Sequence, residues 1–395
     1  MTKLQTQIAI VGAGPAGLML SHLLHLHGIH SIVVEIRSRE YCENRIRAGV
    51  LEQGAVDMLR RTGVADRLDR EGMFHHGIEI GFNRARHRIP MFDLTNGKCV
   101  TVYGQHEVVK DLIARRLADG GDVRFDCSDV SIHQFAGPKP FVGFEDGGHN
   151  YELSADYIAG CDGFHGICRP SVPTGVLQIY ERVYPFGWLG ILADAAPSSE
   201  ELVYMHHDRG FALFSMRSQK LTRLYLQSAP DEDLALWPDD RIWDELFRRF
   251  ECMDGWLPNR GPILQKGVTG MRSFVTEPMQ YGRLFLAGDA AHIVPPTGAK
   301  GMNLAMADVA VLADAFHAYY SSNSTEALDR YSSVCLRRVW KAQRFSWWMT
   351  ALLHRFEDHN EFDDRRQLAE LDYVTSSQAA ATSLAENYVG LPMEP

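Results

Sequence analysis

The stretch Gly12-Ala13-Gly14-Pro15-Ala16-Gly17 decides the fold of this chain. This G-x-G-x-x-G loop directly follows the β-prone run Gln7 to Val11 and opens the segment Pro15 to His27, in which leucines recur at roughly helical spacing. The first glycine permits a tight turn, the second lets the backbone approach a pyrophosphate, and the third lets the helix pack closely on the strand. Amide N–H groups at the start of the helix hold a phosphate anion. The loop therefore predicts a phosphate-binding turn.

The residues that follow complete a β-α-β unit. Gly28 is placed to end the helix, and the β-prone run Ser31 to Val34 leads to an acid, Glu35, 23 residues after Gly12. An acid at the end of the second strand can accept hydrogen bonds from an adenosine ribose. The unit predicts a dinucleotide-binding domain, although it does not distinguish NAD from FAD.

Composition limits the remaining possibilities. A chain of 395 residues with 45% hydrophobic side chains is long enough for two or three cores. A formal net charge of -10 repels nucleic acid and anionic lipid surfaces. The seven cysteines are scattered without a C-x-x-C pair, which favours reduced thiols and no metal site. We see no apolar signal core and no run long enough to span a membrane, so we expect a cytoplasmic protein.

The order of the remaining patterns predicts an α/β fold, α+β overall. Residues 1–178 are expected to form a Rossmann-like β-α-β domain, completed by about 268–300. Aromatic-rich strands between about residues 180 and 227 and a helix at 239–250 predict a β-sheet domain over 179–293. The chain then becomes mainly helical, with helices expected at 301–319, 327–353 and 378–386, so 294–395 is expected to be a helical C-terminal and interface region.

Two later segments indicate which dinucleotide is bound. Arg283 to His292 is a strand running into Gly288-Asp289, and a second helix begins near Gly301. Cys161-Asp162-Gly163 follows another short strand. Together these segments resemble signatures of the flavoprotein aromatic hydroxylases, and the resemblance implies that Asp289 binds the ribityl chain of FAD and Asp162 lies near FAD and the pyridine nucleotide. Amides at such a helix start stabilise negative charge on a reduced flavin. The segments disfavour a plain NAD dehydrogenase.

Within that family the chain resembles the para-hydroxybenzoate hydroxylases, and the resemblance covers essentially its whole length. It implies an FAD-dependent monooxygenase that converts 4-hydroxybenzoate to 3,4-dihydroxybenzoate with NAD(P)H and O2, through a flavin C4a-hydroperoxide. The stretches that carry the resemblance are Arg45 to Gln53, Val100 to Gln105, Tyr157 to Gly166, Glu181 to Gly190, Phe345 to Met349 and Glu386 to Pro392.

The resemblance also implies roles on the substrate side. Arg217, Ser215 and Tyr225 would clamp the substrate carboxylate, which agrees with the chemistry of a guanidinium and two hydroxyl donors. A relay of Tyr204 and Tyr388, continued towards solvent by His75, would remove the phenol proton. Without the resemblance, Tyr204 and Tyr388 would be ordinary core or surface tyrosines, and His75 a surface histidine at a turn.

On the cofactor side the resemblance assigns further residues. Arg223 would accompany movement of the flavin, while Pro296, Thr297 and Asn303 would lie between flavin and substrate. The glycines of the phosphate loop, Glu35, Asp162, Asp289, Arg47, Gln105, Gly301 and Met302 complete the expected FAD contacts.

Contacts to the reductant are implied for Arg37, Tyr41, Arg45, His165 and Arg272. The commonest enzymes of the family place Arg directly after the ribose-binding acid, whereas this chain has Ile36. The loss of that cation leaves the choice between NADPH and NADH open.

Two alternatives remain at this point. The same fold could act on another phenolic acid, such as 3-hydroxybenzoate or 3,4-dihydroxybenzoate, or it could be an FAD-containing binding or sensor protein without turnover. The C-terminal helices carry Trp340, Phe345, Trp347, Trp348 and Leu353 and would pack either a homodimer interface or only the core.

Overall fold

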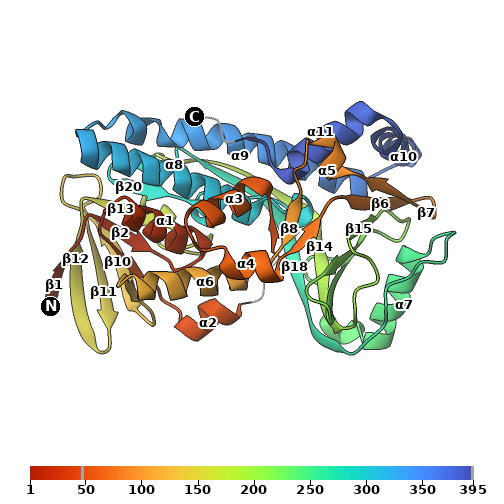
Figure 1. Cartoon of the computed structure of the whole chain (residues 1–395), viewed down its shortest axis with the longest axis horizontal. Helices are drawn as coiled ribbons and strands as arrows, with labels where there is room; N and C mark the ends of the chain where they lie inside the picture. Colours follow the sequence, from red (N-terminus) through yellow and green to blue (C-terminus); the bar gives the residue numbers. More distant parts are fainter. Residues whose placement is uncertain (46–48, 393–395) are drawn as a thin grey trace.

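The first layer is a parallel sheet that holds the phosphate-binding loop. The structure, a computed structural model, describes residues 1–45 and 49–392 (Figure 1). The sheet has the strand order β19-β20-β13-β2-β3-β9, and all pairs except β19 with β20 are parallel. Its strands are β2 (Ile8–Val11), β3 (Ser31–Val34), β9 (Asp122–Arg124), β13 (Tyr157–Gly160), β19 (Gln280–Tyr281) and β20 (Leu284–Leu286).

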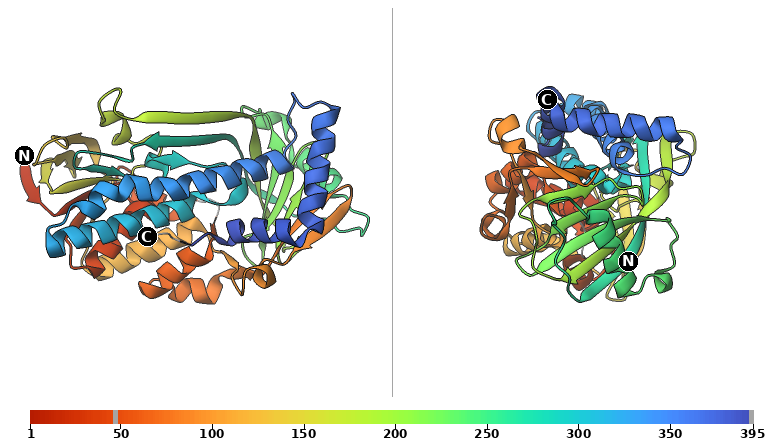
Figure 2. Two further views of the ribbon diagram at one scale, coloured as in Figure 1. Left: turned by 90° about the horizontal axis from the view of Figure 1, so that it is seen from above. Right: turned by 90° about the vertical axis from the view of Figure 1, so that its right-hand side faces the viewer.

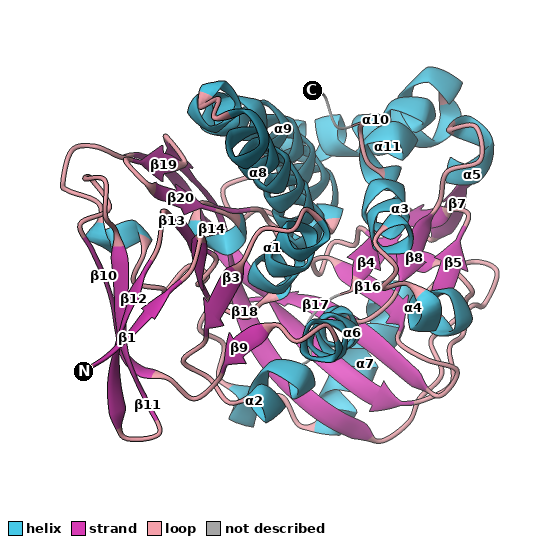
Figure 3. Ribbon diagram, turned by 60° about the vertical axis from the view of Figure 1, so that its left-hand side comes forward, coloured by secondary structure: helices cyan, strands magenta, loops and turns pink. Residues whose placement is uncertain are grey.

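Helix α1 (Pro15–Leu26) follows β2 directly, as the glycine loop predicts. It packs against α6 (Gln105–Ala118) and α8 (Gly301–Ser322), and Figure 3 shows the three helices side by side. Gly28 lies just beyond the end of α1 with a φ of 71°, a conformation that glycine adopts without strain. Beside this layer lies a four-stranded sheet of β1 (Thr2–Gln5), β10 (Ser128–His133), β11 (Phe141–Asp146) and β12 (His149–Ser154).

The second layer is an eight-stranded sheet with the order β21-β18-β14-β17-β16-β15-β6-β7. Its longest strands, β14 and β18, extend from this sheet back along the first layer (Figure 2). Two strands from the first 178 residues, β6 and β7, join this sheet, because β6 pairs in parallel with β15. The three-part division of the chain remains a prediction, and its first part contributes to both sheets. The strands are β6 (Ile78–Phe82), β7 (Ala85–Ile89), β14 (Gln178–Asp194), β15 (Leu202–Met205), β16 (Ala212–Met216), β17 (Leu221–Ser228), β18 (Ile263–Glu277) and β21 (His292–Ile293).

The two faces of this sheet have different partners because side chains alternate along each strand. One face carries Leu189, Phe214 and Leu224 and is buried together with Trp243 of α7 (Asp239–Phe250). The opposite face carries Trp188 and Tyr204, and it is buried together with residues of the C-terminal helices. The second face therefore packs against the C-terminal helices.

The C-terminal helices connect the two layers. Helix α9 (Glu326–Leu353) packs on α8 and runs past both sheets (Figures 1 and 2), and α10 (Glu361–Ser376) and α11 (Gln378–Val389) turn back over the second sheet. The expected helices at 301–319, 327–353 and 378–386 are present and longer, whereas α10 was not expected. Among the described residues, no helix is long and apolar enough to cross a membrane. The predicted fold class, α+β overall with a Rossmann-like domain, is confirmed.

Short elements join the layers near residue 75. Strands β4 (Val50–Leu51), β8 (Val100–Val102) and β5 (Met73–His75) form a three-stranded sheet, with α3 (Gln53–Arg61) and α4 (Asp66–Glu71) beside it. The remaining short helices are α2 (Arg39–Asn44) and α5 (Met91–Leu94). His75 ends β5 and is 0% exposed. Reading it as a surface histidine at a turn is therefore wrong, because the local sequence does not show that the tertiary fold buries it.

Candidate active site

The glycine loop forms an open cradle. Gly12 has a φ of 106°, and a Cβ there would lie 2.4 Å from the Cys161 carbonyl oxygen. A Cβ on Gly17 would lie 1.9 Å from the Gly12 carbonyl oxygen, so helix and loop are in closest contact at this position. A Cβ on Gly14, in contrast, would meet nothing within 4 Å. The space beside Gly14, at the start of α1, fits a pyrophosphate.

Glu35 fixes the conformation of the glycine loop. One carboxylate oxygen, Oε2, accepts a hydrogen bond from the Ala13 amide at 2.6 Å, and Oε1 accepts one from the Arg37 amide at 2.8 Å. The side chain is buried, and charge-assisted bonds of this kind are stronger than neutral ones. Glu35 therefore links the loop to the end of β3, beside the expected position of the ribose.

We expect Glu35→Ala to weaken FAD binding by at least about 10-fold, because the amides of Ala13 in the glycine loop and of Arg37 after β3 lose their acceptor. Fluorescence titration of the apoprotein with FAD measures this effect. Glu35→Gln keeps an acceptor for one amide and should lie between the wild type and Glu35→Ala. Equal FAD affinity in all three proteins would contradict the assignment.

The three cofactor motifs meet at this loop. Gly12 lies against Cys161 and Asp162, and a Cβ on Gly288 would lie 3.1 Å from Ala305 of α8 and 3.5 Å from Ala16 of α1. The Gly-x-Gly loop, the Asp-Gly turn and the Gly-Asp segment are thus adjacent, although they are far apart in the sequence.

Asp162 has an unused acceptor. Its Oδ2 accepts a hydrogen bond from the Cys168 amide at 2.8 Å, while Oδ1 is buried with no hydrogen-bond partner within the described residues. Burial raises the pKa of this carboxyl group. A buried oxygen without a partner is costly, so this atom fits a hydrogen-bond donor from a bound cofactor.

The start of α8 provides a second anion-binding feature. The short 3-10 helix Pro296–Gly298 leads through Ala299, whose φ is 53°, to Lys300, and no side chain caps the helix. The first amides of α8, which include those of Gly301 and Met302, therefore remain available to an anion. This arrangement fits the negative edge of a reduced flavin.

Both polar atoms of the Asn303 side chain form hydrogen bonds within the protein. Its Oδ1 accepts a hydrogen bond from the Glu52 amide at 2.9 Å, and its Nδ2 donates to the carbonyls of Val50 and Ala299 at 3.0 and 2.8 Å. In this arrangement Asn303 connects α8 to the start of α3. Thr297 nearby is buried, and Pro296 is exposed.

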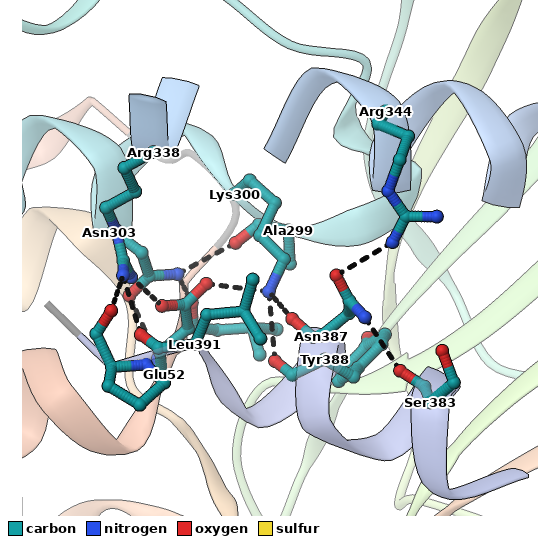
Figure 4. A network of polar contacts seen from close by, with 12 residues as sticks. Glu52, Ala299, Lys300, Asn303, Arg338, Arg344, Ser383, Asn387, Tyr388 and Leu391 are labelled. Atoms are coloured by element: carbon teal, nitrogen blue, oxygen red, sulfur yellow. Dashed lines mark hydrogen bonds and ion pairs between the residues drawn. The ribbon is translucent and has the colours of Figure 1, made fainter. Parts of the chain in front are cut away.

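A buried ionic network surrounds Asn303 and was not predicted from the sequence (Figure 4). Lys300 Nζ lies 2.6 Å from Glu52 Oε1, and Arg338 Nη2 lies 2.7 Å from Glu52 Oε2. Burial lowers the pKa of Lys300, and Glu52 opposes that shift. A lysine beside a glycine-rich turn ordinarily points into solvent, so the sequence gives no signal for its burial.

The expected carboxylate clamp lies on the inner face of the second sheet. Ser215 of β16 is opposite Arg223 of β17, and Tyr225 lies two residues further along β17, so the three side chains share a face. Arg217 follows on the same face, with Nη2 3.5 Å from the Tyr225 hydroxyl and a buried Nε without a hydrogen-bond partner. Burial lowers the pKa of Arg217. A bound anion would accept the hydrogen bond that this guanidinium leaves unused.

The two relay tyrosines are in direct contact. The hydroxyl oxygens of Tyr204 and Tyr388 are 2.5 Å apart, and the Tyr204 hydroxyl lies 3.2 Å from the Thr297 carbonyl oxygen. Both side chains are buried, and burial raises both pKa values. Tyr204 and Tyr225 share a sheet face, because each is opposite Leu213 in the neighbouring strand. The hydroxyl pair and the clamp therefore face the same space.

His75 is buried separately from the tyrosine pair. Neither of its ring nitrogens has a hydrogen-bond partner among the described residues, and burial lowers its pKa to about 4, partly offset by Glu201. The structure gives no hydrogen bond from His75 to Tyr204 or Tyr388, so the last step of the relay remains a prediction.

The low pKa of His75 gives a pH dependence of stability. An unfolded histidine titrates near pH 6.5, so between about pH 6.5 and 4 the unfolded chain binds the proton that the folded chain excludes. Stability should therefore fall with decreasing pH, by about 3 kcal/mol from this residue. We expect His75→Asn to flatten the change in urea midpoint between pH 7 and pH 5. The same slope in both proteins would argue against a buried neutral His75.

The expected nucleotide contacts form two groups. The guanidinium groups of Arg37 and Arg45 lie 5.3 and 5.5 Å from the centre of the Tyr41 ring. Arg272 lies 4.8 Å from the Phe164 ring centre, and the His165 ring is 5.0 Å from that of Phe164. Arg47 lies outside the described residues, and Gln105 is the half-buried first residue of α6.

A second contact that was not predicted from the sequence lies beside Tyr225 on the same face of the second sheet. The Trp188 indole N–H donates to Nε2 of the buried His354 at 2.7 Å, and the Trp188 ring lies 4.9 Å from that of Tyr225. The acceptor role assigns the proton of His354 to Nδ1, which lies 3.0 Å from the Thr350 carbonyl oxygen. Only the three-dimensional fold brings together positions 188 and 354.

The described residues contain no cluster of histidine, cysteine, aspartate or glutamate that could hold a metal ion. The glycine loop and the start of α8 present backbone amides, and Asp162 adds a buried acceptor oxygen without a partner among the described residues. They suit phosphates and a flavin.

Comparisons with known proteins agree with this geometry. The family model described as "FAD binding domain" matches residues 5–346. The p-hydroxybenzoate hydroxylase of Acinetobacter baylyi is 51% identical over 394 residues, which cover 100% of this chain and 97% of that protein. A 3-(3-hydroxy-phenyl)propionate/3-hydroxycinnamic acid hydroxylase of Mycolicibacterium gilvum is 27% identical over 82% of this chain and 56% of its own length.

The fold is also shared with solved structures. The crystal structure of a p-nitrophenol 4-monooxygenase from Pseudomonas putida superposes with a TM-score of 0.84 at 18% sequence identity, covering 99% of this chain and 100% of that one. At this level of identity the likeness concerns the fold alone.

The chain belongs to the FAD-binding family of flavin-dependent aromatic hydroxylases, within the group that contains p-hydroxybenzoate hydroxylase. The predictions of FAD as cofactor and of a flavin-dependent monooxygenase are thereby confirmed.

Proposed function

We propose that this enzyme hydroxylates 4-hydroxybenzoate at the 3-position, forming 3,4-dihydroxybenzoate. The single observation that carries the proposal is the shared sheet face, which presents an anion-ready Arg217 with Tyr225 and the Tyr204–Tyr388 hydroxyl pair to one space. A para-hydroxylated benzoate has an anion at one end of its ring and a phenol at the other. The relative from Acinetobacter baylyi carries the name of an enzyme for this substrate.

The protein side of the reaction follows from these contacts. Arg217, with the hydroxyls of Ser215 and Tyr225, would anchor the carboxylate and so orient the ring. Tyr204 would accept the substrate phenol proton while passing its own hydroxyl proton to Tyr388, and Tyr388 would pass its proton on towards solvent. A phenolate is a better ring nucleophile than a phenol. Bound FAD would supply the redox chemistry, taking hydride from NAD(P)H and activating O2.

Other phenolic acids remain the alternative substrates. Titration of the FAD-loaded protein with 4-hydroxybenzoate, 3-hydroxybenzoate and 3,4-dihydroxybenzoate, followed through the flavin absorbance, separates the acids. We expect 4-hydroxybenzoate to bind most tightly. Tighter binding of another acid would reassign the substrate.

For the reductant we propose the two groups around Tyr41 and Phe164 as the binding residues. Their support is the concentration of arginines beside the exposed ring of Tyr41 and the half-buried ring of Phe164, which suits a nucleotide phosphate. Both NADPH and NADH remain candidates, because exposed Ile36 stands where a cation would meet a 2′-phosphate.

The enzyme is further proposed to work in the cytoplasm as a homodimer. The support is that all seven cysteines are free and that α9 exposes Trp340 and Trp347. Sedimentation at micromolar concentration tests the assembly, and a monomer there would contradict it.

A further inference from the structure

The end of α11 is held by two cations from other helices. The last carbonyls of a helix have no partner within it. Lys300 Nζ donates to the carbonyls of Asn387 and Tyr388, the latter at 3.1 Å, and Arg338 Nη1 donates to the carbonyl of Leu391 at 2.6 Å. Figure 4 shows both cations pointing at this segment. The backbone that carries Tyr388 is therefore fixed from two sides.

Glu52 joins the two cations beneath this segment. Each of its carboxylate oxygens pairs with one of them, and its side chain is 6% exposed. The segment lies directly on this carboxylate, because a Cβ on Gly390, whose φ is 102°, would be 2.3 Å from Glu52 Oε2. Removing Arg338 would leave Glu52 Oε2 and the Leu391 carbonyl without this hydrogen-bond donor, and a buried acceptor without a donor is unfavourable. The segment and the carboxylate should therefore move together.

We propose that Arg338 is a positioning residue for the hydroxyl pair of Tyr204 and Tyr388. It contacts neither hydroxyl. It acts through Glu52 and Leu391, which hold the end of α11 so that Tyr388 stays at hydrogen-bond distance from Tyr204. The inference rests on the proposed function only where it assigns proton transfer to that pair.

Arg338 is a better test of this inference than Lys300. Lys300 stands at the start of α8, so its loss would also change the electrostatic potential at the expected flavin position. Arg338 comes from α9 and not from the start of α8. Its substitution therefore changes the position of the segment with the least direct effect on the flavin.

Hydrogen exchange of the FAD-loaded protein tests the positioning without turnover. In Arg338→Met we expect amides of residues 378–392 to exchange at least about 10-fold faster, while peptides of α1 and α7 stay unchanged. Arg330→Met is the matched control, since Arg330 lies on the same helix, is exposed and only approaches Glu326 at 4.0 Å. Wild-type exchange at 378–392 in Arg338→Met would overturn the proposal.

A double-mutant cycle then tests the link to the hydroxyl pair. We expect Arg338→Met to lower hydroxylated product per reductant by at least about 3-fold, with partial recovery in Arg338→Lys. In a Tyr388→Phe background the same change should have no further effect. An equal further loss in that background would assign Arg338 a purely structural role. If the wild type makes no hydroxylated product, the proposed function fails, and the exchange result still decides the positioning.

Discussion

Replacing Arg217 with alanine should reduce the affinity for 4-hydroxybenzoate by at least about 100-fold, corresponding to about 2.7 kcal/mol. The guanidinium is buried next to Tyr225 with one nitrogen lacking a partner, so a bound carboxylate would complete its hydrogen bonds. Truncating one member of a buried charge pair usually costs about 2 to 5 kcal/mol of binding free energy. Titration of the flavin absorbance with the substrate measures the loss.

Two controls make this result specific. Lys220→Ala, an exposed cation in the turn between β16 and β17, should bind 4-hydroxybenzoate like the wild type. The neutral 4-hydroxybenzamide should bind the wild type and Arg217→Ala with nearly equal affinity, because it carries no anion. An unchanged affinity of Arg217→Ala for 4-hydroxybenzoate would remove the case for a benzoate substrate.

Tyr204→Phe and Tyr388→Phe should retain FAD and lose most hydroxylation. A positioned acid or base accelerates a reaction about 10²- to 10⁴-fold. We therefore expect the hydroxylation step to be at least about 10-fold slower and more reductant to be consumed per product. Each substitution removes one hydroxyl of a buried pair 2.5 Å apart and leaves the ring packing in place. Product per reductant, measured by chromatography against absorbance at 340 nm, reports the effect.

Tyr373→Phe provides the control, since Tyr373 is 55% exposed on α10. It should couple reductant use to product like the wild type. If both relay variants retained wild-type coupling, the hydroxyl pair would have no role in activating the substrate.

Much of the cofactor half could be predicted because its chemistry depends on local sequence. The turn at Gly12, the helix from Pro15 and the acid at Glu35 follow from spacing and backbone geometry. The Gly288-Asp289 segment was recognisable only through its resemblance to the flavoprotein aromatic hydroxylases.

The rest depends on contacts that no local pattern encodes. Strands β6 and β7 cross into the second sheet, and His75, just before β6, is buried although its local sequence resembles a surface turn. Glu52 contacts Lys300 and Arg338, which lie 248 and 286 residues further along the chain, and Trp188 contacts His354, 166 residues away. Helix α10 has many charged residues and no strong apolar period, so its capping box at Asn360 is its clearest sequence signal.

The measurement that tests the account most directly is oxygen-dependent oxidation of NADPH and NADH by the FAD-loaded enzyme, with and without 4-hydroxybenzoate, with identification of the product. We predict strong stimulation by 4-hydroxybenzoate and formation of 3,4-dihydroxybenzoate, with the faster nucleotide identifying the reductant. Absence of stimulation with both nucleotides would contradict the proposed substrate and leave only the flavoprotein fold.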